Sequence, residues 1–198
     1  MEEELNPRLE EAKQEHRKVY FVDAAHFVLG SFIGCLWCIV RIFIPCSSGR
    51  NRYNVLGAID AVTYQLITVC NETYINACSV CELLQKIREV TVGEMPITLV
   101  MDNARYQRCG LVTQLAENLN IELLFLPSYS PNLNLIERLW KWVKKDCLYC
   151  KYYERFSEFK DAINISLLKV SKPEHRNEMS TLLSLKFQLF DSAIYNRA

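Results

Sequence analysis

The chain has 198 residues, half of them apolar, and its 23 basic and 23 acidic side chains give a formal net charge of zero. This length and apolar share suit one domain of ordinary size with a substantial core. No apolar run reaches the roughly 18 residues that a membrane-spanning helix needs, and the acidic, polar start is unlike a signal peptide. We therefore expect a cytoplasmic protein with no membrane segment. The zero net charge argues mildly against a large basic surface.

The order of predicted elements indicates an α/β fold. Residues 1–17 look like a charged lead-in or linker helix without a core face of its own. The expected strands are 19–23, one or two within 33–46, a hairpin of 55–62 and 65–70, then 97–101 and 121–126. The expected helices are 76–92, 106–119, 135–148, 156–170 and 173–185. An antiparallel meander followed by strands that alternate with helices predicts a mixed sheet flanked by helices.

The nine cysteines include three C-x-x-C pairs, which raise the question of a zinc site. The pairs are Cys35/Cys38, Cys78/Cys81 and Cys147/Cys150. They fall on predicted strands or helices and lack the turn-rich flanks of a zinc knuckle. Because a reducing cytosol keeps thiols free, we expect small apolar side chains, with neither structural zinc nor disulfides.

Three acidic residues lie at the ends of different predicted elements. Asp23 closes the apolar run VYFVD, Asp102 closes ITLVMD, and Glu137 begins the helix of residues 135–148. A carboxylate at the end of a buried strand is costly unless a cation meets it, and ligands gather at the carboxyl ends of strands in open α/β sheets. Three converging carboxylates would suit hard divalent cations such as Mg²⁺, which prefer oxygen ligands.

Each acid also has an interpretation that needs no ligand. Asp102 could cap the helix that follows it, and Glu137 stands at the capping-box spacing from Asn134. Asp23 is harder to explain in this way, because no turn residue or helix follows it closely. His26 is a candidate neighbour of the site, although a lone histidine near a strand end is more often an ordinary hydrogen-bonded side chain.

The helix of residues 135–148 combines an apolar stripe with a basic face. The expected core positions are Leu135, Leu139, Trp142 and Val143. Basic residues lie close to Glu137, and they are Arg138, Lys141, Lys144 and Lys145. They could form exposed pairs with the glutamate, or they could contact the phosphates of a nucleic acid. The two interpretations are compatible.

Taken together, three segments resemble the catalytic domain of DDE transposases, on the bacterial insertion-sequence side of the mariner group. These segments are FVDAAH, VMDNARYQ and LPSYSPNLNLIERLWKWVK, with 34 residues between Asp102 and Glu137. The resemblance covers residues 18 to 150, with a tail to about 185. The third acid is Glu here and Asp in mariner elements proper, which favours the insertion-sequence branch. Many relatives have a histidine where this chain has Tyr106-Gln107, and the role of that position stays open.

The resemblance implies a ribonuclease-H-like fold in which Asp23, Asp102 and Glu137 bind two Mg²⁺ ions, for which Mn²⁺ can substitute. It implies DNA cleavage and strand transfer, with Asn103 and Asn134 beside the site. Residues 18–150 would form the catalytic domain and 151–198 a helical extension of it. The expected partners are double-stranded DNA (transposon ends and target) and a second copy of the chain.

Two further possibilities stay open at this point. Full-length relatives carry helix-turn-helix modules before the catalytic domain, so we expect either a separately encoded DNA-reading half or a gene fragment. The chain could also be an inactive or truncated remnant that only binds DNA or dimerises, or a non-transposing ribonuclease-H-like nuclease. The spacing of the last two acids and the SPNLNLIERLW segment favour the transposase.

Overall fold

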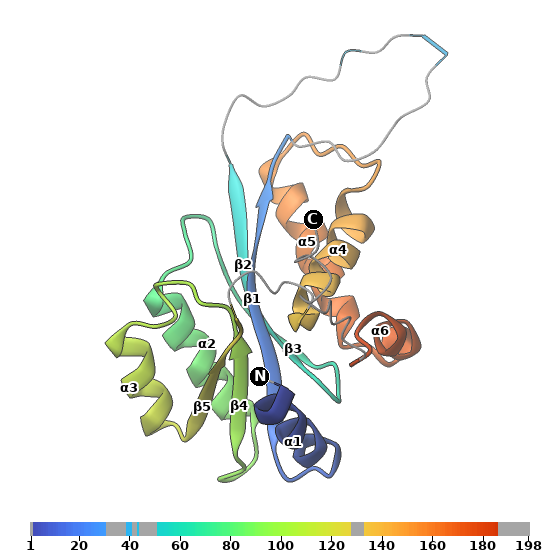
Figure 1. Ribbon diagram of the computed structural model, residues 1–198. Coiled ribbons are helices and arrows are strands. Elements are labelled where there is room, and N and C mark those ends of the chain that lie inside the picture. Colours follow the sequence, from blue (N-terminus) through green and yellow to red (C-terminus); the bar gives the residue numbers. More distant parts are fainter. Residues whose placement is uncertain (1, 31–38, 41–42, 44–50, 128–132, 186–198) are drawn as a thin grey trace, which may run out of the picture.

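A five-stranded mixed sheet forms the centre of the molecule (Figure 1). The computed structural model describes all residues except 1, 31–38, 41–42, 44–50, 128–132 and 186–198. The strands are β1 (Lys18–Val28), β2 (Arg52–Asp60), β3 (Leu66–Asn71), β4 (Ile97–Met101) and β5 (Ile121–Phe125), in the order β3-β2-β1-β4-β5. β1, β2 and β3 pair antiparallel, whereas β4 is parallel to both β1 and β5. The expected mixed sheet is therefore confirmed, and the strands expected within 33–46 lie largely outside the described residues.

Helices cover both faces of the sheet (Figure 1). One face carries α2 (Ala77–Val90) and α3 (Gly110–Asn118) over a core that we call the α2-side cluster, which includes Tyr20, Val22, Leu56, Leu83 and Met101. The other carries α1 (Glu2–Lys13), α4 (Leu135–Leu148), α5 (Phe156–Val170), a short 3-10 helix η2 (Pro173–His175) and α6 (Arg176–Leu182). Its core, the α4-side cluster, includes Phe21, Phe27, Val100, Ile136 and Trp140. Within the described part of the chain, no helix is long and apolar enough to cross a membrane.

The first helix belongs to the core, which the sequence interpretation missed. Leu5, Leu9 and Ala12 recur at helical spacing on α1 and are buried in the α4-side cluster. The expectation that residues 1–17 lack a core face is therefore wrong. Glu4 and Glu10 are exposed on this helix, and the many glutamates of the segment obscured a short apolar stripe.

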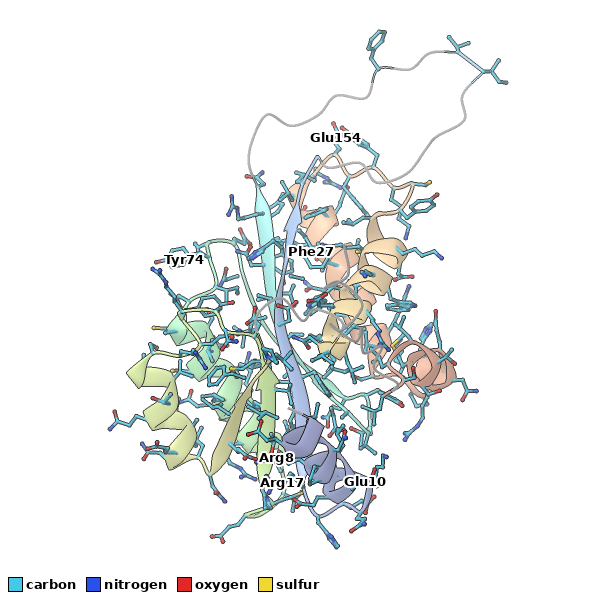
Figure 2. The ribbon with its side chains drawn as sticks, in the orientation of Figure 1. Arg8, Glu10, Arg17, Phe27, Tyr74 and Glu154 are labelled. Atoms are coloured by element: carbon cyan, nitrogen blue, oxygen red, sulfur yellow. The ribbon has the colours of Figure 1, made fainter. Side chains whose placement is uncertain are left out.

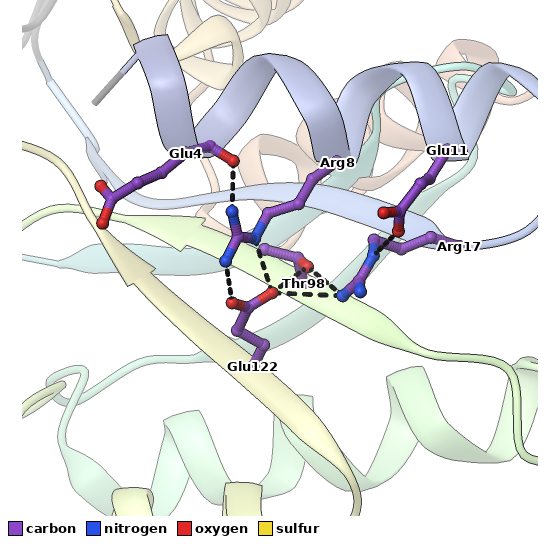
Figure 3. Close-up of polar contacts among 6 residues, drawn as sticks. All are labelled: Glu4, Arg8, Glu11, Arg17, Thr98 and Glu122. Carbon is purple, nitrogen blue, oxygen red and sulfur yellow. Dashed lines mark hydrogen bonds and ion pairs between the residues drawn. The ribbon is translucent and has the colours of Figure 1, made fainter.

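A charged network fastens α1 to the beginning of the parallel strands (Figure 3). Arg8 donates hydrogen bonds from two guanidinium nitrogens to the Glu122 carboxylate, one of them Nε to Oε2 at 2.8 Å. Arg17 Nη1 donates to Thr98 Oγ1 at 2.9 Å and lies 3.2 Å from Glu122 Oε2. The Arg8 hydrogen bond is the main cause that lowers the pKa of Glu122 to about 2. Figure 2 shows Arg8 and Arg17 together at this end of the sheet.

Most later elements match their expected limits, but α3 and α6 begin later than expected. β4 and the helices α4 and α5 have the predicted bounds. Helix α3 begins at Gly110 instead of residue 106, because the chain turns at 105–107 and Cys109 is the N-cap. On this helix Leu111 is 56% exposed, and Val112 and Ala116 face the core. The segment from Asp102 to Cys109 is thus a loop.

β1 extends well beyond the end of β4, and this difference in length opens the sheet where the acids lie. The parallel pairing ends with Phe21 opposite Val100, whereas β1 continues to Val28 against β2. Figure 2 shows Phe27 on this extended part of β1, on the side of α4. The main-chain groups of β1 that face β4 therefore lose their strand partner from Val22 onward.

Candidate active site

The sheet places Asp23 and Asp102 side by side. Each acid follows the last parallel pair, Phe21–Val100, by two positions in its own chain segment. Because side chains alternate along a strand and both members of that pair lie in the α4-side cluster, Asp23 and Asp102 are directed toward the face covered by α4. The first two acids thus occupy the opening between the ends of β1 and β4.

Burial and neighbouring acids dominate the electrostatics of Asp23. Its pKa is raised to about 6, first by burial and then by the charges of Asp102 and Glu137. The backbone N–H of Ala24 and the indole of Trp140 favour the charged form, and no basic residue is among the causes. The Trp140 N–H lies near the carboxyl without a well-formed hydrogen bond. Asp23 is thus a carboxyl without a cationic partner among the described residues.

Helix α4 carries the third acid. Glu137 is the third residue of α4, and burial is the main cause that raises its pKa. The charge of Lys141, one turn later, opposes this rise, and the charge of Asp102 adds to it. Glu137 therefore lies within electrostatic reach of the first two acids, with one lysine beside it.

Two asparagines span the gaps between diverging strand ends. Asn134 is buried, and its Nδ2 donates to the carbonyl oxygen of Val22 at 3.1 Å, next to Asp23 in the chain. Asn103 Nδ2 donates in the same way to the carbonyl of Leu126, just past β5. Both Oδ1 atoms are buried, and neither has a hydrogen-bond partner among the described residues. These asparagines fix the segments that carry the acids and leave two oxygen acceptors unused.

The capping box expected at the start of α4 does not form. Asn134 is the N-cap residue, but its side chain makes no capping hydrogen bond. Its amide is instead committed to Val22 on β1. The side chain of Asn134 thus ties the helix to the sheet, which a pattern based on local spacing could not show.

Of the remaining predicted site residues, His26 lies on β1 and the four basic residues lie on α4. His26 lies three positions after Asp23 on a regular strand, so it points to the opposite face, where Nδ1 is 2.7 Å from Asn54 Oδ1. Arg138 donates to the carbonyl of Ser184 at 3.0 Å, and the Lys144 ammonium lies 5.9 Å from the centre of the Phe27 ring. Lys141 and Lys145 are exposed. The structure thus separates His26 from the acids.

Two residues near the acids, Tyr106 and Trp140, were given no role in the sequence analysis. Burial is the main cause that raises the pKa of Tyr106 to about 12, and the charges of Asp102 and Asp23 add to it. Trp140 is buried against the sheet beside Asp23, whereas the expected core residue Trp142 is only partly buried. The signal for Tyr106 was its place in the loop after Asp102. Trp140 is one turn after Glu137, but both tryptophans fit an apolar stripe.

The donor set suits hard divalent cations, although it is not drawn together tightly. Three carboxylates and two unused amide oxygens are the oxygen ligands that Mg²⁺ and Mn²⁺ prefer. Among the described residues, however, no three histidine, cysteine, aspartate or glutamate side chains are close enough together to hold a metal ion. The three acids influence one another through space but do not form a compact cluster, which agrees with the mutual repulsion of like charges.

Comparison with curated proteins identifies a relative from an insertion element. A curated relative, the insertion element IS630 uncharacterized 39 kDa protein of Shigella sonnei, is 27% identical over 143 residues. The match covers 69% of this chain and 40% of that relative, so the chain spans well under half of the relative's length.

Solved structures with the same fold are transposase and integrase cores. The Mos1 transposase catalytic domain, solved with raltegravir and Mg, has a TM-score of 0.56 at 13% identity over 94% of this chain and 92% of that one. The Mos1 strand transfer complex has a TM-score of 0.57 at 12% identity, covering 94% of this chain and 59% of that one. The BIV integrase catalytic core has a TM-score of 0.51 at 14% identity, with 78% and 84% covered. The fold is ribonuclease-H-like, as expected.

A family model with the description DDE superfamily endonuclease matches residues 40–160. This match covers more than half of the chain and includes Asp102, Glu137 and the whole of α4. The chain belongs to the DDE superfamily endonuclease family.

Proposed function

We propose that this chain is the catalytic domain of an insertion-sequence transposase, which cuts DNA and transfers its strands with divalent metal ions. The observation that carries the proposal is that Asp23, Asp102 and Glu137 lie within electrostatic range of one another where β1 and β4 separate, with no basic partner for Asp23 among the described residues. A carboxyl that burial and neighbouring acids make harder to ionise is typical of a functional site. Family membership supports the assignment.

The residues of this chain would hold two Mg²⁺ ions, with Mn²⁺ as a substitute. Such a pair activates water or a DNA 3′-hydroxyl and stabilises the leaving oxygen when bound. Asp23 and Asp102 come from adjacent strands, and Glu137 approaches from α4. The amides of Asn103 and Asn134 hold the segments on which these acids lie.

The exposed lysines of α4 provide a contact for the DNA backbone. Lys141 lies one turn after Glu137, and its charge favours the ionised form of that acid. Lys141 and Lys145 are both exposed on the helix, so their ammonium groups can meet phosphates without reading sequence. The Mos1 neighbours include a strand transfer complex and a catalytic domain solved with Mg, which supports DNA and a divalent metal as partners here. Assembly as a homodimer and a cytoplasmic location stay predictions.

The test is metal-dependent cleavage of duplex DNA by the purified chain and by Asp102→Asn. We expect cleavage only with Mg²⁺ or Mn²⁺, and a loss of at least about a hundredfold in the variant, because a ligand charge is removed while the shape is kept. Calorimetric titration with Mn²⁺ gives a second readout, in which the variant should bind more weakly. Asp161→Asn, which changes an exposed aspartate of α5, is the matched control.

Circular dichroism should show the same folded state for all three proteins. Cleavage that persists in Asp102→Asn, or that proceeds equally well with a chelator present, would contradict the proposal. Equal Mn²⁺ binding by the wild-type chain and Asp102→Asn would contradict the assigned site.

A further inference from the structure

Gly57, in the middle of β2, lies directly beside the proposed site. It pairs with Asp23 in the antiparallel register of β1 and β2. A methyl group on Gly57 would lie 2.7 Å from Cη2 and 2.9 Å from Cζ2 of Trp140, and 3.2 Å from Cδ1 of Ile136. Carbon atoms of neighbouring groups normally stay about 3.5–4.0 Å apart. Helix α4 therefore rests on the bare backbone of β2 at this point.

The need for glycine is steric and not conformational. Among the described glycines, Gly30 and Gly93 have a positive φ and Gly57 does not, so Gly57 has a backbone conformation that any residue can adopt. The pairing on both sides of β2 runs through Gly57 without a bulge. A glycine in a strand interior weakens the strand and often marks a site of close approach, and here the approaching group is the outer ring of Trp140.

The residues that touch Gly57 come from the turn of α4 that carries Glu137. Ile136 precedes the acid by one position, and Trp140 follows it by three. Both are buried in the α4-side cluster, with exposures of 0% and 5%. Moving this turn away from the sheet would move Glu137 with it, because a helix turn behaves as a rigid unit within a packed core.

We propose that Gly57 and Trp140 are positioning residues, which together set the depth of α4 on the sheet and so the distance from Glu137 to Asp23 and Asp102. The inference rests on the proposed function, since it assigns these two residues to the metal-binding geometry of the same site. Neither residue needs to touch DNA or a metal ion. The absence of a side chain at Gly57 and the bulk of Trp140 are complementary parts of one contact.

The experiment compares four variants: Gly57→Ala, Trp140→Phe, the double variant, and Gly110→Ala as the control. Phenylalanine lacks the outer ring atoms that meet Gly57, so it makes room for the new methyl group. The control adds the same methyl group at the start of α3, where no heavy atom lies within 4 Å of it. The readouts are the thermal midpoint without metal, Mn²⁺ affinity by calorimetry, and kcat and KM for DNA cleavage.

We expect Gly57→Ala to lower the thermal midpoint and to weaken Mn²⁺ binding by about tenfold or more, as disturbed supporting residues of metal sites do. Its kcat should fall while its KM for DNA is retained. The double variant should match Trp140→Phe in midpoint and Mn²⁺ affinity, because the added methyl group no longer meets the ring. Gly110→Ala should keep the Mn²⁺ affinity, kcat and KM of the wild-type chain, and its thermal midpoint should not fall, because alanine is at least as favourable as glycine in a helix.

The outcomes separate this inference from the proposed function. If wild-type chain shows no Mn²⁺ binding that depends on Asp102, the proposed function fails and the inference fails with it. If the wild-type chain binds Mn²⁺ but folded Gly57→Ala binds it equally well, only the inference fails. If Gly57→Ala does not fold, the double variant decides: Mn²⁺ affinity equal to that of Trp140→Phe supports the inference, and a weaker affinity in a folded protein overturns it.

Discussion

The two ends of the parallel strands shift the pKa of a carboxyl group in opposite directions. At their beginning, Glu122 accepts hydrogen bonds from Arg8 and Thr98 and lies 3.2 Å from Arg17, and its pKa falls to about 2. At their far end, Asp23 meets burial and other acids, and its pKa rises to about 6. At the first end, arginines of the chain itself neutralise the carboxylate, and this ion pairing stabilises the fold. At the second end, the fold places a carboxylate where its negative charge is unfavourable. Binding of an external cation would remove this unfavourable energy.

The largest expected effect comes from removing the main ion-pair partner of Glu122. Arg8→Met keeps most of the aliphatic stem but removes the main partner of Glu122. We expect the free energy of unfolding to fall by about 1–2 kcal/mol, less than for a fully buried pair because solvent screens these side chains. Urea denaturation measures this loss. Lys13→Met, which disturbs an exposed pair with Glu10 on the same helix, is the control and should change little. Equal losses of unfolding free energy in Arg8→Met and Lys13→Met would contradict a special stabilising role of the Arg8–Glu122 pair.

Removing the carboxylate charge of Asp23, at the other end, should increase the free energy of unfolding. Asp23→Asn eliminates a carboxylate that burial and the charges of Asp102 and Glu137 disfavour. We expect a gain of about 1 kcal/mol in the free energy of unfolding at pH 7 without metal, together with loss of Mn²⁺ binding. Denaturation in the presence of a chelator measures the gain. A clear loss of stability would show that Asp23 already has a favourable partner within the chain.

The two carboxyls should also act in different pH ranges. The lowered pKa of Glu122 makes stability rise with pH from about 2 to about 4.5, because the unfolded chain binds the proton more tightly in that range. The raised pKa of Asp23 makes stability fall from about pH 3.8 to about 6, because there the folded chain binds the proton more tightly. Thermal midpoints without metal should therefore peak near pH 4–5, and saturating Mg²⁺ should raise them at pH 7 but not at pH 4.

The smallest expected effect concerns the exposed lysines of α4, the helix that carries Glu137. Lys141→Ala and Lys145→Ala should each reduce the slope of log affinity for duplex DNA against log salt concentration by about 0.9. Lys86→Ala, on α2 at the opposite face of the sheet, should leave the slope unchanged. Fluorescence anisotropy at several salt concentrations measures these slopes. An equal change in Lys86→Ala would mean that DNA does not approach from the α4 face.

The sequence was sufficient where local pattern decides structure. The limits of β4, α4 and α5 followed from apolar periodicity and flanking turns, and the three acids stood out because each ends or begins such an element. The apolar spacing of Leu5, Leu9 and Ala12 was also present in the sequence, but surrounding charge hid it. The Gly57–Trp140 contact and the bond from Asn134 to Val22 join residues that are far apart in the chain, so no local pattern could predict them.

The docking of α1 also has a consequence for the order of events during synthesis. Arg8 and Glu122 are 114 positions apart, so at ordinary translation rates about 5–20 s separate their appearance from the ribosome. During that interval the apolar residues Leu5 and Leu9 have neither the sheet nor α4 to cover them. Helix α1 is thus synthesised well before the strand to which Arg8 binds, and the nascent chain exposes an amphipathic segment that chaperones can bind until β5 has been made.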